Sequence, residues 1–174
     1  MKQEETVFFK RLERCFWGIW VLFPFVLWFA IHYMWTSPYA FFNDADAPRA
    51  IVSTFSFGGQ MLVSVEMLIH ISFYVVLMVL MHMLVRRFAR GKMLMSATLG
   101  TMKNIAWLLL AYACIEMPLY NLNMYLLHSF GDLPSWEPLY YLDVMSLALA
   151  LTLFALRILI RHAIALQEDA DLTV

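Results

Sequence analysis

The chain alternates between long apolar runs and shorter segments where polar residues gather. Four runs reach the length of a bilayer span, at about residues 15–35, 61–85, 104–126 and 139–160. A spanning helix needs about 20 apolar residues. The apolar residues stand in blocks rather than alternating with charged ones, so they do not resemble the inner faces of a soluble core. The pattern predicts an all-α fold, an integral membrane four-helix bundle in a single domain.

Polar segments connect the four predicted spans. We expect outer loops at 36–60 and 127–138, a cytoplasmic loop at 86–103 and a cytoplasmic tail at 161–174. Within the middle loop, residues 93–103 are predicted to form a short surface helix with Ser96 as its cap.

The basic residues predict the orientation. Of the twelve Lys and Arg residues, eleven lie before the first span, between the second and third, or at the inner end of the fourth. Only Arg49 falls in either outer loop. Cytoplasmic segments of membrane proteins are enriched in Lys and Arg. The N-terminus and the C-terminus are therefore both predicted to be cytoplasmic.

Composition narrows the possible functions. Hydrophobic residues make up 63% of the 174 residues and charged residues only 14%, whereas soluble domains carry about 25% charged residues. Four spans leave no room for a separate catalytic domain, so we expect no enzymatic activity. Cys15 and Cys114 form no CxxC pair, which argues against thiol redox chemistry.

Several polar residues lie inside the predicted spans, where a charged side chain costs at least ~2.5–3.5 kcal/mol and usually faces the bundle interior. At about 1.5 Å per residue, Glu66, His70 and Glu116 lie roughly 9 to 15 Å below the outer ends of their helices. We predict an outward-facing polar pocket. Its expected lining residues are Glu66, His70, Glu116, Asn123 and Asp143.

Other interpretations of this group stay open. The same residues can simply hydrogen-bond between helices and fix their packing. Glu66, His70 and Glu116 can hold one divalent ion, and His32 with His70 can hold a haem. A transport role is a further alternative, although four helices without a repeat suit alternating access poorly. We expect neither a resident cofactor nor a metal.

The predicted cytoplasmic face carries the remaining candidate residues. A basic segment follows the second span, and an acidic tail ends on apolar residues. The basic segment also suits contact with anionic lipid. The residues that we expect to dock a partner are Arg86, Arg87, Arg90, Lys92, Leu166, Glu168, Asp169, Leu172 and Val174.

Two motifs resemble a known family. One is Phe-x-Arg-Gly-Lys at 88–92, followed by Leu99, Lys103 and Ile105, and the other is the ending Ala-x-x-Leu-Gln-Glu-x-x-Asp-Leu-Thr-Val at 163–174. They are similar to a bacterial family of small four-helix membrane proteins that is classed as a domain of unknown function. The resemblance covers roughly residues 50–174. Genes of this family commonly sit beside a small helix-turn-helix regulator of the phage-repressor type.

The resemblance implies a regulatory or sensor protein of the bacterial cytoplasmic (inner) membrane that acts on a cytosolic helix-turn-helix DNA-binding protein. The chain itself would contact the lipid bilayer and no nucleic acid, and a homo-oligomer is compatible with it. The alternative functions are a small-molecule or ion transporter, or a haem- or metal-binding redox membrane subunit. The family has no established catalytic residues, so the resemblance assigns none here.

Overall fold

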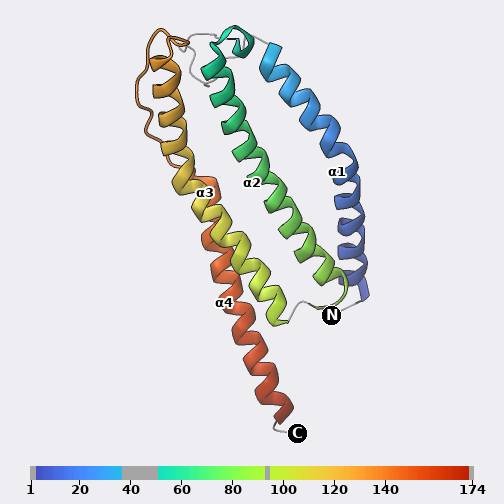
Figure 1. Ribbon diagram of the computed structural model, residues 1–174. Helices are drawn as coiled ribbons and strands as arrows, with labels where there is room; N and C mark the ends of the chain where they lie inside the picture. The colour runs from blue at the N-terminus through green and yellow to red at the C-terminus, as the bar shows by residue number, and fades with distance from the viewer. Residues whose placement is uncertain (1–2, 37–50, 93–94, 173–174) are drawn as a thin grey trace. The chain divides into compact units, whose positions relative to one another are not determined.

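The computed structural model describes residues 3–36, 51–92 and 95–172, and the described part of the chain is helical without strands. The helices are α1 (Gln3–Thr36), α2 (Phe57–Ala89), α3 (Ser96–Ser129) and α4 (Val144–Leu172), and a 3₁₀ turn, η1, spans Val52–Thr54 (Figure 1). The all-helical fold class that the sequence predicts is confirmed.

Each of the four helices contains a stretch that is long and apolar enough to cross a membrane. These stretches are Val7–Tyr33, Phe57–Ala89, Ser96–Ser129 and Val144–Leu166. In lipid, a helix satisfies its backbone hydrogen bonds within one segment, so long apolar runs adopt this structure. Large apolar side chains such as Phe25 and Met145 are 70% and 71% exposed, as lipid-facing residues would be. The chain is therefore a multi-pass membrane protein.

The helices extend beyond the predicted spans. α2 and α3 have 33 and 34 residues, which corresponds to about 50 Å against about 30 Å of hydrocarbon. The apolar pattern of the sequence shows only the part of each helix that lies in hydrocarbon. The helix itself continues until a glycine or a capping residue ends it. The expected surface helix at 93–103 is wrong for residues 96–103, which form the first turns of α3. The segment 139–143 is not helical.

Glycine ends both α2 and α3. Gly91 and Gly131 have φ angles of 71° and 79°, a left-handed conformation that L side chains rarely adopt. At the first end, the Gly91 and Lys92 amides donate to the Phe88 and Arg87 carbonyls, both at 2.9 Å. This paired backbone pattern, the Schellman motif, satisfies the last carbonyls of a helix. The second end repeats it, so no side chain is needed to cap either helix there.

The chain divides into two compact units. The first comprises Met1–Gly18, Phe73–Cys114 and Leu142–Val174. Its core is an apolar cluster from three helices: Leu84, Met102, Ile105, Leu109 and Ala150. The Trp107 and Phe154 rings also pack edge to face, with centroids 5.5 Å apart. Packing of α3 against α4 and the end of α2 thus holds this unit together.

The second unit comprises Ile19–Ser72 and Ile115–Tyr141. Its buried cluster joins η1, the start of α2, the end of α3 and the segment after α3: Val52, Phe55, Val63, Met124, Leu127 and Leu133. The residues just before α2 are therefore part of a core, because Val52 and Phe55 are 1% and 6% exposed.

Candidate functional site

A polar cluster lies in the second unit, between α2 and α3. The Glu66 carboxyl lies within interaction distance of the Asn123 amide and the His70 ring. His70 Nδ1 donates to the Glu66 carbonyl oxygen at 2.9 Å, which leaves Nε2 as an acceptor when the ring is neutral. Asn123 is only 4% exposed, and its Nδ2 has no hydrogen-bond partner among the described residues. A buried amide donor thus lies beside a carboxyl group.

The other two predicted pocket residues are placed differently. Glu116 is half-buried and belongs to the same unit, seven residues before Asn123 and so on nearly the same face of α3. Asp143 belongs to the first unit, immediately before α4. Its Oδ1 accepts the Ser146 amide at 3.0 Å, which makes it the N-cap of α4. The structure thus brings Glu66, His70 and Asn123 together and gives Asp143 a capping role.

The start of α2 is fixed by a carboxylate that the sequence analysis did not single out. Asp132 follows α3, and its two oxygens accept the Ser56 amide at 2.5 Å and the Ser56 hydroxyl at 2.7 Å. Ser56 Oγ in turn accepts the Gly59 amide at 3.1 Å. A Cβ at Gly59 would overlap the Asp132 carboxylate, so this close approach requires glycine.

Asn121 fixes the segment that follows α3. Its Oδ1 accepts the Leu139 amide and its Nδ2 donates to the Leu139 carbonyl, both at 2.8 Å. His128 Nδ1 adds a hydrogen bond to the Leu133 carbonyl at 3.0 Å. Asn121 and His128 therefore hold the segment after α3 in place through hydrogen bonds to its backbone. Turn and capping residues after α3 are visible in the sequence, but their partners are not.

The basic segment predicted to dock a partner lies at the end of α2, in the first unit. Arg87 Nη1 donates to the Ala97 carbonyl and to Thr101 Oγ1. Thr98, fully buried, donates its hydroxyl to the Lys92 carbonyl at 2.7 Å. These bonds join the end of α2 and the loop after it to the first turns of α3.

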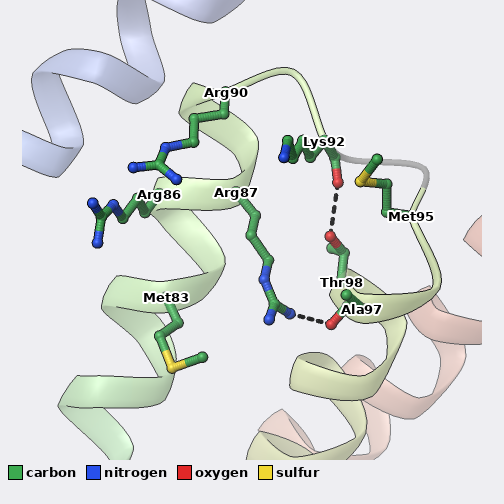
Figure 2. Close-up of a pocket in the computed structure, with 8 residues that line it drawn as sticks. All are labelled: Met83, Arg86, Arg87, Arg90, Lys92, Met95, Ala97 and Thr98. Carbon is green, nitrogen blue, oxygen red and sulfur yellow. Dashed lines mark hydrogen bonds between the residues drawn. The ribbon is translucent and has the colours of Figure 1, made fainter.

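A pocket of about 310 Å³ opens at this junction (Figure 2). In Figure 2 the Arg87 side chain reaches from α2 toward Ala97, and Lys92 lies on the loop beside it. Arg86 lies in the last turn of α2, and Arg90 directly follows the helix. The pocket is lined by Met83, Arg86, Arg87, Arg90, Lys92, Met95, Ala97 and Thr98. All four basic residues predicted for docking thus line one hollow, and none of the described residues that line it is a carboxylate.

The end of α4 carries the other docking candidates. Leu166 is 70% exposed, and Asp169 is also exposed. Val174 lies outside the described residues, as do the side chains of Glu168 and Leu172. Among the described side chains of α4, Ile160 is the last that packs against the core of the first unit.

Neither site presents a ready metal centre. Among the described residues, no group of three or more His, Cys, Asp or Glu side chains is placed to hold a metal ion. The cluster around Glu66 offers one carboxyl, one amide and one imidazole, a set suited to hydrogen-bonding a small polar ligand. The pocket at the end of α2 offers cations, which suit an anion.

The chain was compared with known protein families, curated proteins and solved structures. The sequence model of one family matches residues 31–174, and that family is described as "Protein of unknown function (DUF2975)". No curated protein and no solved structure matches the chain. The resemblance to a domain of unknown function is thus confirmed, while its bacterial origin and its neighbouring regulator stay predictions.

Proposed function

The chain belongs to this DUF2975 family, and on that premise we propose that it is a non-enzymatic regulator of the bacterial cytoplasmic membrane. Its proposed partner is a cytosolic helix-turn-helix DNA-binding protein, and both termini lie on the cytoplasmic side. The four candidate spans leave only helix ends and short connections outside the lipid. Such surfaces are too small for a catalytic domain but large enough to dock a small protein.

The end of α4 is the observation that carries the proposal. α4 has 29 residues, about 43 Å, and therefore exceeds the roughly 30 Å of hydrocarbon. Beyond Ile160 the side chains of Arg161, His162 and Leu166 are exposed. A helix that leaves the bilayer with an exposed leucine among charged residues suits helix-in-groove docking. The basic end of α2 adds a second charged surface for the same partner.

The cluster around Glu66 supports a sensing role. The Asn123 amide lies buried beside the Glu66 carboxyl, and a few converging polar groups of this kind are typical of small-ligand sites. α2 carries both Glu66 and the basic end, and α3 carries Asn123 and the residues that Arg87 binds. The same two helices therefore connect the proposed sensing group with the proposed docking surface.

Co-purification tests the docking surface. We expect the proposed partner, a helix-turn-helix protein encoded beside this chain, to co-purify with the full-length protein and to be lost when Glu168–Val174 is deleted. Leu166→Ala should weaken the complex because it removes an exposed apolar contact. Leu139→Ala is the matched control, since Leu139 is also exposed but lies before α4. Unchanged capture of the partner by the deletion variant would refute docking at this end.

A transcriptional reporter tests the sensing group. Glu66→Gln and Glu116→Gln should alter the output of the regulator while the amount of inserted membrane protein stays constant. If both variants fail to accumulate in the membrane, interhelical packing is the better account of these residues.

A further inference from the structure

The pocket at the end of α2 has the features of an anion site. We propose that it binds a phosphate group, carried either by an anionic phospholipid or by a soluble phosphate. This inference does not depend on the proposed regulatory function. It rests on four cations around one hollow, on the way the fold holds them, and on the size of the hollow.

The charges around the pocket are not balanced within the described part of the chain. Arg86 pairs with Glu13 through its Nε at 3.6 Å, but the Arg86 side chain is 51% exposed, and such pairs are weak. Arg90 and Lys92 are exposed and form no ion pair among the described residues. Because no carboxylate among the described residues lines the pocket, an anion would neutralise the charges of Arg90 and Lys92.

The fold also holds the Arg87 guanidinium and the Lys92 backbone in place. Arg87 is fixed through Nη1 by Ala97 and Thr101, and the guanidinium has further N–H donors. A planar guanidinium matches the spacing of two phosphate oxygens. Lys92 follows the Gly91 turn, and its backbone is held at both its amide and its carbonyl. Groups positioned before binding lose less entropy when a ligand arrives.

The start of α3 also favours an anion in the pocket. Ala97 lines the pocket in the first turn of this 34-residue helix, where the first amides lack intrahelical acceptors. The positive end of a helix dipole favours anions. The carbonyl end of α2 has the opposite sign, so the positive charge of the hollow comes from the basic side chains and from the start of α3.

The size of the hollow favours a phosphate group over a protein. A volume of about 310 Å³ stands at the lower limit of ordinary ligand pockets, which begin at about 300 Å³. The pocket lies where two membrane-spanning helices end and begin. Basic pockets of this kind at the cytoplasmic membrane surface bind phosphorylated lipid headgroups.

The experiment uses the full-length protein purified in an uncharged detergent. Binding of phosphatidylglycerol and of phosphatidylcholine is measured by native mass spectrometry, and binding of inorganic phosphate by calorimetry. The test variant is Arg90→Gln/Lys92→Gln, which removes two charges and spares the bridging Arg87. The control is Lys103→Gln/Arg161→Gln, which removes two exposed charges outside the pocket.

We expect the Arg90→Gln/Lys92→Gln variant to bind the phosphate ligand at least about tenfold more weakly, since each membrane-proximal cation contributes about a factor of five. The control should bind like the unmodified protein. If the Arg90→Gln/Lys92→Gln variant loses binding of phosphatidylglycerol, the phosphate group belongs to a lipid. If it loses binding of inorganic phosphate, the phosphate is a soluble one. Equal binding by both variants, equal loss in both, or no binding of either phosphate probe would overturn the proposal.

Discussion

The two ends of α2 are built in opposite ways. At its start, Ser56, Gly59 and Asp132 satisfy one another through hydrogen bonds of 2.5 to 3.1 Å. At its end, Arg90 and Lys92 are exposed and form no ion pair within the described part of the chain. The first end uses its polar side chains to hold the fold, whereas the second keeps charges available for a ligand or a partner.

The difference follows from how each helix end is capped. The first amides of a helix need acceptors, and at the start of α2 the Ser56 hydroxyl oxygen accepts the Gly59 amide. The last carbonyls are satisfied by the backbone turn at Gly91. Side chains at the end of α2 are therefore not needed as caps, and Arg90 and Lys92 stay exposed there.

The largest effect is expected at Asp132. Asp132→Ala removes two hydrogen bonds to Ser56 and the negative charge at the start of α2, and should lower the free energy of unfolding by about 2–3 kcal/mol. Denaturation in detergent micelles measures this loss. Glu137→Ala, an exposed carboxylate in the same connection, should change little.

A double variant sharpens this result. Gly59→Ala should destabilise the unmodified protein, because its Cβ would overlap the Asp132 carboxylate. The same substitution should cost less in the Asp132→Ala background, where the carboxylate is absent. Strictly additive losses would show that the two residues do not interact.

A smaller loss is expected at Asn121. Asn121→Ala removes both hydrogen bonds to the Leu139 backbone and should cost about 1–2 kcal/mol. Hydrogen exchange at the Leu139 amide should accelerate with it. Asn104→Ala, an exposed asparagine on the same helix, is the control. Equal exchange in both variants would contradict the role of Asn121.

Asp143 should give a smaller, pH-dependent effect. Hydrogen bonds from the Ser146 hydroxyl and amide lower the pKa of Asp143. A carboxylate whose folded pKa is depressed stabilises the fold above its unfolded pKa, and that contribution is lost as the pH falls through the folded pKa. Asp143→Asn should therefore weaken the fall in stability under acid. Identical acid denaturation curves would refute this cap.

The smallest effect is expected at the basic end. Arg90→Gln/Lys92→Gln should change the free energy of unfolding in uncharged detergent by no more than about 0.5 kcal/mol, as is usual for exposed positions. The same denaturation assay used for Asp132→Ala measures it. A loss as large as that of Asn121→Ala would mean that these cations hold the fold, and the contrast between the two ends would disappear.

Much of the fold could be predicted from the sequence. Four apolar blocks predict four helices, and the structure confirms them. Gly91 and Gly131 mark helix ends by a local rule. The residues where each helix begins and ends were harder to predict, because the apolar pattern cannot show how far a helix extends beyond hydrocarbon. This is why the first turns of α3 were predicted as a separate surface helix.

The candidate sites were predictable only in part. The spacing of Glu66 and His70 places them on one helix face, and the basic residues at 86–92 stand together in the sequence. Asp132 was missed because its partner Ser56 lies 76 residues away, and no local pattern reports such a pairing. The sequence also offers Asp143 as a pocket residue, whereas the structure shows it capping α4.

By itself, then, the sequence determined the four membrane-spanning helices, because an apolar segment in lipid must satisfy its own backbone and does so only as a helix. The tertiary structure decided which polar residues hydrogen-bond to other parts of the chain. It pairs Asp132 with Ser56 and Asn121 with Leu139, and it leaves Arg90 and Lys92 beside a hollow. Pairing depends on distances across the fold, and those distances exist only once the helices have packed.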